Sequence, residues 1–282
     1  MPADSLTPSS TAPASTPRRF GFRFGVGQQP CAEPRSGDRS RLPALRQWNC
    51  PATVATPTQE PMNWEAIVTT LKLATITAIV LAFVGLPVSY WVAFSKWRWK
   101  FFAEAVVALP LVLPPTVLGF YVLVALGPRS PIGRWYESWS GHGLAFTLEG
   151  LVVASTLYSL PFAVQPVAAA FRSIDRRLIE ASWTLGVSSW GTFFRVIVPQ
   201  AKAGLIAGFV LSFAHTVGEF GVVLMVGGNI PGVTRTISIS VYDEVQSLNY
   251  ASAAMTSLVL LIFSFVILSL VYALTSKRGR VI

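Results

Sequence analysis

Residues 173–200, SIDRRLIEASWTLGVSSWGTFFRVIVPQ, lie between two long apolar segments. Four apolar residues in the first half of this stretch recur at spacings of four, three and four: Ile174, Leu178, Ala181 and Leu185. This spacing predicts one apolar face of a short helix. Gly186 follows at the position where a residue in the left-handed conformation commonly ends a helix. We therefore predict a short helix that ends in a glycine turn.

The second half of the stretch predicts another short helix. Ser188 or Ser189 is a candidate N-cap for a helix that begins at Trp190, and Pro199 is expected to end that helix before the next apolar segment. A helix, a glycine turn and a helix between two membrane spans suit insertion into a groove of a partner protein. They suit equally an interfacial helix that lies flat on the bilayer.

Apolar segments long enough to cross a bilayer surround this stretch. A spanning helix needs about 20 mostly apolar residues, and five segments qualify, at about residues 67–94, 101–126, 148–171, 203–226 and 251–275. Prolines interrupt the first three, which is tolerated where neighbouring helices or a water-filled cavity satisfy the freed carbonyls. With 52% hydrophobic and 12% charged residues, the chain is not a water-soluble globular protein. The expected fold class is an all-α membrane protein with five transmembrane helices.

The distribution of Lys and Arg predicts the orientation of these helices. Residues 95–102, residues 172–202 and the carboxyl-terminal tail share one side of the membrane and carry eleven Lys and Arg residues. The opposite side carries four, counting Lys72 just inside the first helix. Because positive charge gathers on the cytoplasmic side, we expect a cytoplasmic carboxyl terminus. The net charge of +9 is then a signal of topology and does not indicate a nucleic acid partner.

Residues 1–61 differ in composition from the rest of the chain. They hold 10 of the 20 prolines, no lysine, and both cysteines, Cys31 and Cys50. Such a stretch is expected to be disordered, and it lacks the apolar core of a secretory signal. In a five-span topology its seven arginines would lie on the outer face, against the positive-inside rule. Met62 is therefore a candidate true start, with residues 1–61 an extension from a mis-called start and residues 62–282 the membrane domain.

The central stretch resembles the EAA motif, E-A-A-x(3)-G-x(9)-I-x-L-P, of the permease subunits of binding-protein-dependent ABC importers. Four residues match it in register: Glu180, Ala181, Gly186 and Pro199. Three depart from it by a small or isosteric change: Ser182, Val196 and Val198. The resemblance implies the type I importer permease (MetI-like) fold, in which this loop is a coupling helix that docks on the ATP-binding subunit. The docking residues that it implies are Glu180, Ala181, Ser182, Gly186 and Pro199.

Three further stretches are similar to the permeases of molybdate importers: LPLVLPPTVLGFYVLVALG (109–127), the loop SPIGRWYE, and HTVGEFGVVLMVGGNIPGVTRTISISVYD (215–243). This resemblance covers about residues 64–282. It implies a multi-pass protein of the cytoplasmic (inner) membrane that imports molybdate as a homodimer. Its implied partners are two copies of an ATP-binding subunit and a periplasmic or extracytoplasmic molybdate-binding protein. Sulfate/thiosulfate permeases also carry a GEFG-like run and are the nearest alternative, and the sequence does not separate molybdate from tungstate.

The candidate residues of a translocation path or gate are Pro114, Pro115, Thr116, Glu219 and Arg235. The two prolines would bend their helix and Thr116 could satisfy a freed carbonyl, so this bend is either a packing feature or a constriction of the path. For Glu219, an acid within the fourth span, we favour a structural bond to backbone or a neighbouring helix over a gating role. Arg235 is either a donor to the oxyanion or an outer-face charge.

The sequence indicates a transport subunit and not an enzyme. It contains no phosphate-binding loop G-x-x-x-x-G-K-[ST], so ATP hydrolysis is expected on a separate subunit. We predict no metal and no cofactor, and we expect His215 to form a bond between helices. Two other classes are less favoured: a secondary transporter, which would show an internal repeat and more ionisable residues at depth, and an intramembrane hydrolase built on Ser212 and His215.

Overall fold

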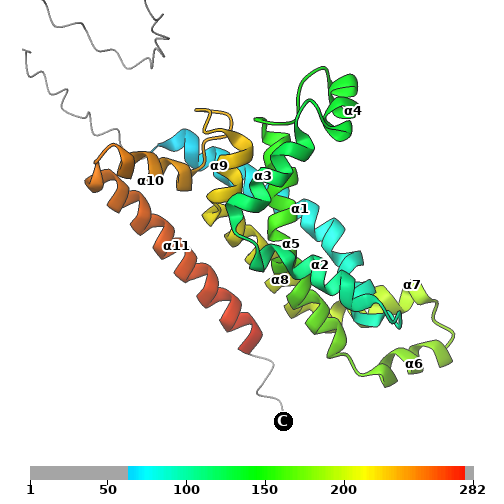
Figure 1. Ribbon diagram of the computed structural model, residues 1–282. Coiled ribbons are helices and arrows are strands. Elements are labelled where there is room, and N and C mark those ends of the chain that lie inside the picture. The colour runs from blue at the N-terminus through cyan, green and yellow to red at the C-terminus, as the bar shows by residue number, and fades with distance from the viewer. Residues whose placement is uncertain (1–62, 277–282) are drawn as a thin grey trace, which may run out of the picture. The chain divides into compact units, whose positions relative to one another are not determined.

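The computed structural model describes residues 63–276, and every regular element within them is helical (Figure 1). The predicted extension 1–61, the candidate start Met62 and the basic tail from Lys277 lie outside the described residues. Four described helices are long and apolar enough to span a membrane: Trp64–Phe94, Leu148–Arg172, Ser189–Gly218 and Tyr250–Ala273. A bent pair, Lys100–Val112 with Pro115–Leu126, supplies a fifth if it is counted as one span. The all-helical membrane fold is therefore confirmed.

Three helices pack against one another to form the centre of the fold: α1 (Trp64–Phe94), α5 (Leu148–Arg172) and α8 (Val198–Gly218). Small residues allow the backbones of α5 and α8 to approach closely. A Cβ added at Gly204 would lie 2.3 Å from the Cβ of Ala170, and one at Gly208 would lie 2.7 Å from the carbonyl oxygen of Ala163. The glycines of α8 thus set its distance from α5.

The second expected span is broken at its prolines. Helix α2 (Lys100–Val112) and helix α3 (Pro115–Leu126) meet at an angle of 112°. Pro115 fits the first position of α3 because no N–H is needed there, and the carbonyl of Pro114 accepts hydrogen bonds from two backbone N–H groups of α3. Beyond the bend, α3 packs against α9 (Gly221–Gly227).

The fourth expected span is also divided. Helical structure begins earlier than predicted, at Ser189, and α8 ends at Gly218. Glu219 has extended backbone, with φ −70° and ψ 134°, so the chain leaves the helix before α9 begins at Gly221. The fifth expected span is α11 (Tyr250–Ser276), which packs against α8 and against α10 (Ile237–Gln246).

The short helices gather at the two ends of this bundle (Figure 1). Helices α4 (Pro131–Ser140), α9 and α10 lie at the end where α1 begins. Helices α6 (Arg176–Thr184) and α7 (Ser189–Thr192) lie at the other end. From α7 the chain continues through a π-helical turn, η1 (Phe193–Ile197), directly into α8. Residues 173–200 therefore project from one end of the bundle.

Candidate functional site

The first helix of the projecting segment is built by local hydrogen bonds at both of its ends. Asp175 caps α6, because its carboxylate accepts a hydrogen bond at 2.9 Å from the backbone N–H two residues later. At the other end Gly186 has φ +76°. The N–H groups of Gly186 and Val187 donate to the carbonyls of Trp183 at 2.9 Å and of Ser182 at 3.1 Å. These bonds make a Schellman motif, so the predicted glycine turn is confirmed.

The second helix begins as predicted but does not end at Pro199. Ser188 caps α7, with its hydroxyl accepting a hydrogen bond from the N–H of Gly191 at 3.2 Å. The helix then runs through η1 into α8, so Pro199 lies in the first turn of α8 and the prediction that it ends the helix is wrong. In η1 the N–H of Val198 donates to the carbonyl of Phe193, five residues earlier. This shift of register accommodates a proline that has no N–H to donate, and such π-helical turns are frequent at functional sites.

The inner side of α6 is joined to the membrane helices. Ile179 packs in a cluster with Phe171 of α5 and Ile197 of η1. The buried hydroxyl groups of Ser182 and Thr192 share a hydrogen bond between α6 and α7. The serine that replaces the alanine of the motif therefore has a partner within this chain. Both contacts tie α6 to the start of α8.

The outer side of α6 is apolar and open. Leu178, Ala181 and Leu185 are all exposed, Leu185 to 82%. We call these three residues the outer α6 face. Ile174, which shares their spacing, precedes the helix and is buried, so only part of the predicted apolar face is open. Glu180 is exposed on a different side of α6, where it lines a cavity of about 270 Å³ next to α1.

Three of the predicted path residues line a second site. Pro115, Thr116 and Glu219 border one cavity of about 520 Å³, where α3, α5 and the break after α8 meet. Tyr158 of α5 and His215 of α8 complete its polar lining. The bend before α3, which the prolines predict, and the break after α8, which was not predicted, bring these side chains together.

Glu219 is buried at this cavity, with 4% of its surface exposed. Neither of its carboxylate oxygens meets hydrogen-bond geometry with a partner among residues 63–276. Its backbone carbonyl accepts a hydrogen bond from the hydroxyl of Ser238 at 2.6 Å. The hydroxyl of Ser155 on α5 lies near enough to interact with the carboxylate, and the favoured bond to a neighbouring helix stays a prediction. Buried polar groups without partners are rare and costly, and an acid at membrane depth is a functional candidate.

His215 forms the expected bond between helices. Its Nδ1 lies 2.9 Å from Oγ of Ser159 on α5, and its ring stacks on Phe162 with centroids 3.9 Å apart. Ser212 instead donates to the backbone carbonyl of Phe209 at 2.9 Å. The Ser212–His215 pair that an intramembrane hydrolase would need is therefore not formed.

Arg235 lies away from this cavity, in the loop between α9 and α10. Its Nε donates to Oδ1 of Asn229 at 2.8 Å, and its guanidinium lies 3.6 Å from the carboxylate of Asp243. Asn229 also donates to both oxygens of Asp243, at 3.1 and 2.9 Å. These contacts clamp the loop onto α10.

Two site residues carry no signal that sequence reasoning detects. Tyr158 reaches the cavity only because α5 packs beside α8, and Thr192 reaches Ser182 only because the glycine turn brings α7 next to α6. Leu178 and Leu185, by contrast, are found from their spacing alone.

Comparison with known proteins identifies the family. The model of the family described as binding-protein-dependent transport system inner membrane component matches residues 85–280. The Molybdenum transport system permease protein ModB of Azotobacter vinelandii is 51% identical over 213 residues, which are 76% of this chain and 93% of that protein. The protein of the same name from Escherichia coli K12 is 35% identical, over 66% and 81% of the two chains. The probable sulfate transport system permease protein cysT of Zygnema circumcarinatum is 30% identical, over 80% and 78%.

Solved structures of ABC transporters share the fold. One is a bacterial alginate ABC transporter, solved in complex with an alginate pentasaccharide-bound periplasmic protein. It aligns with a TM-score of 0.60 at 17% identity, over 79% of this chain and 81% of that one. An inward-facing form of the MetNI methionine ABC transporter aligns with a TM-score of 0.56 at 17% identity, over 76% and 96%. With the matched family model and the EAA-like segment on α6, the chain belongs to the binding-protein-dependent transport system inner membrane components, the permease subunits of ABC importers.

Proposed function

We propose that the chain is the permease subunit of an ATP-driven importer that carries molybdate across the inner membrane. The observation that carries this proposal is its 51% identity to a molybdenum permease over 93% of that protein, against 30% identity to a sulfate permease. Sulfate, thiosulfate and tungstate remain the alternative substrates to be tested.

Family membership defines the type of transporter to which the chain belongs. The chain is a multi-pass inner-membrane transport subunit that works with a substrate-binding protein and an ATP-binding subunit, and it is not itself an enzyme. Within that frame we propose a homodimer in which each copy docks one ATP-binding subunit. The carboxyl terminus and α6 then face the cytoplasm, as the excess of Lys and Arg on that side favours.

The docking surface in this proposal is the outer α6 face together with the Gly186 turn. Three exposed apolar side chains on one face of a helix suit a groove of a partner. Of the motif residues, Ala181 belongs to that face, Gly186 shapes the turn, and Ser182 joins α6 to α7. Glu180 lies on the side of α6 that faces α1, and Pro199 lies in the first turn of α8, the helix that would receive the motion. Closure of the ATP-binding subunits would pull on α6 and, through η1, on α8.

The path in this proposal passes the cavity that Glu219 borders. The hydroxyl groups of Thr116 and Tyr158 can donate hydrogen bonds to an oxyanion. Neither carries a positive charge, so an anion would be held there by hydrogen bonds alone. A weak site of this kind suits transport, because a tightly held ion would not leave. Arg235, which is bound to Asn229 and Asp243, is not assigned to the path.

A transport assay in cells tests the substrate. A strain lacking its own molybdate permease should regain uptake of radiolabelled molybdate when this chain is expressed with its cognate ATP-binding and substrate-binding proteins. Excess tungstate should compete strongly and excess sulfate weakly. Uptake of sulfate in place of molybdate would overturn the assignment within the family.

A further inference from the structure

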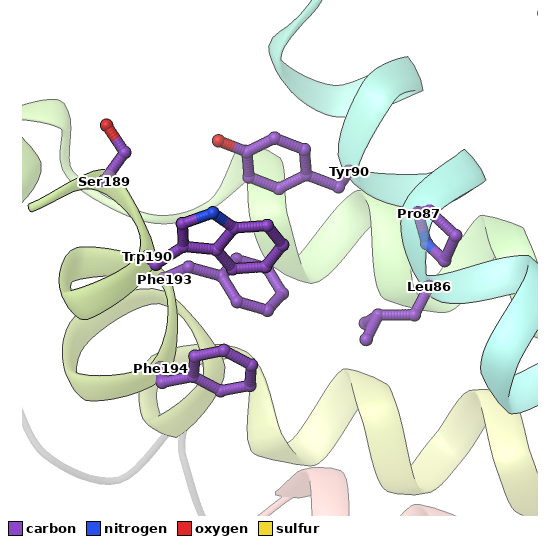
Figure 2. Close-up of a pocket in the computed structure, with 7 residues that line it drawn as sticks. All are labelled: Leu86, Pro87, Tyr90, Ser189, Trp190, Phe193 and Phe194. Atoms are coloured by element: carbon purple, nitrogen blue, oxygen red, sulfur yellow. The ribbon is translucent and has the colours of Figure 1, made fainter.

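Two cavities that share lining residues lie between the last turns of α1 and the projecting segment. The larger of the two, about 390 Å³, lies between α1 and the turn formed by α7 and η1, and Ser189 is the one lining residue that is neither apolar nor aromatic (Figure 2). The smaller, about 270 Å³, lies between α6 and the end of α1 and contains Lys96 and Arg176 in its lining. Tyr90 and Ser189 line both cavities. An apolar chamber therefore adjoins a basic one.

The apolar chamber lies at a membrane boundary. Figure 2 shows Trp190, Phe193 and Phe194 gathered on one side of it, with Leu86 and Pro87 of α1 across the space. Trp190 and Phe194 are stacked, with centroids 6.1 Å apart, and are 74% and 61% exposed. They stand at the start of the span Ser189–Gly218, and the chamber's other wall belongs to the last turns of the span Trp64–Phe94. Trp and Tyr side chains at such a depth are typical of the lipid interface.

The basic chamber carries one surplus positive charge. Lys96 and Arg176 are exposed, and within residues 63–276 neither forms an ion pair. Glu180 is the one acidic residue in the lining, which leaves a net charge of +1. The phosphodiester of an anionic lipid carries one negative charge, which matches the net charge of the basic chamber. The adjoining apolar chamber matches the acyl chain of the same lipid.

We propose that the two chambers together bind one anionic phospholipid of the surrounding bilayer, with its phosphate between Lys96 and Arg176 and an acyl chain against Trp190 and Phe194. The lipid would hold α6 and η1 against the end of α1. This site is separate from the outer α6 face, because Arg176 and Glu180 point to the side of α6 that faces α1 while Leu178 and Leu185 do not line either chamber. A docked ATP-binding subunit and a bound lipid can therefore coexist.

The assembled complex of permease and ATP-binding subunit tests this site. It is placed in nanodiscs of phosphatidylcholine alone or of an equimolar mixture with phosphatidylglycerol, and the lipid retained after transfer to detergent is measured by native mass spectrometry. We expect retained phosphatidylglycerol and little phosphatidylcholine. Because each cation near the bilayer surface contributes about fivefold to anionic-lipid binding, Lys96→Gln with Arg176→Gln should weaken retention roughly 30-fold. Arg98→Gln with Lys202→Gln removes the same charge from exposed residues outside the chambers and should change nothing.

A second arm locates the acyl chain in the wild-type complex. Phosphatidylglycerol with a photoactivatable acyl chain should label Trp190, Phe193 or Phe194, and unlabelled phosphatidylglycerol should compete while glycerol phosphate should not. This arm decides the matter if the double variant fails to assemble. Four results would each overturn the proposal. In the retention assay they are equal retention of both lipids and equal loss in the two double variants. In the labelling assay they are displacement by glycerol phosphate and cross-links from these aromatic residues to a protein subunit in place of lipid.

Discussion

Replacing Gly186 tests whether the turn after α6 must be preformed for coupling. Its φ of +76° lies in the left-handed region, where a residue with a Cβ pays about 1–2 kcal/mol. Nothing lies within 4 Å of an added Cβ, so this cost is conformational and not steric. Gly186→Ala should therefore reduce the population of the native turn by about 5- to 30-fold relative to alternative turns.

A graded series sharpens this prediction. Asn tolerates the left-handed region better than Ala, and a β-branched residue tolerates it least, so function should fall in the order Gly, Asn, Ala, Val. Gly143→Ala is the matched control, because an added Cβ there also meets nothing and no positive φ is required. The readouts are molybdate uptake and transport-coupled ATP hydrolysis by the assembled complex, normalised to the amount assembled. Equal activity of Ala, Val and Gly at this position, or an Asn variant as poor as Val, would show that coupling does not depend on a left-handed residue here.

Three further predictions follow from burial and contacts. Leu185→Asp should leave the thermal midpoint of the isolated permease unchanged, because the side chain is 82% exposed. The same substitution should weaken binding of the ATP-binding subunit at least tenfold, which is roughly the free energy of burying one leucine side chain. Undiminished binding would exclude the outer α6 face as the docking surface. Gly204→Val should destabilise the bundle by about 1–3 kcal/mol, seen as a lower thermal midpoint in detergent, because even a Cβ would lie 2.3 Å from that of Ala170. Arg235→Gln should keep uptake within about twofold. It removes a partly exposed ion pair with Asp243, of about 0.2–1 kcal/mol, and one hydrogen bond to Asn229, of about 0.5–1.5 kcal/mol, neither of which is in the proposed path. Lost uptake at unchanged stability would make Arg235 a substrate ligand.

The spans could be predicted because length and apolar content are sufficient signals for crossing a bilayer. Their interruptions could be predicted only in part. Pro114 and Pro115 predict a bend, but its angle of 112° depends on the packing of α3 against α9. The break at Glu219 lies inside one predicted apolar segment, residues 203–226, and a single acid does not by itself end a span.

The projecting segment shows the same division between local and tertiary signals. The helix, the glycine turn and the N-cap depend on neighbouring residues, and they follow from the spacing around Gly186. The helix continues through Pro199 because a π-helical turn precedes it, and such turns have no simple sequence pattern. Which apolar residues of α6 stay exposed depends on the packing of Ile179 against α5 and η1.

Import of molybdate by this chain is expected to depend on ATP. The most direct measurement is uptake of radiolabelled molybdate into proteoliposomes that contain the purified permease with its ATP-binding subunit, with the substrate-binding protein outside and ATP inside. We predict accumulation that requires both ATP and the binding protein and that excess sulfate barely reduces. Accumulation that persists without ATP, or that occurs with sulfate and not with molybdate, would contradict it.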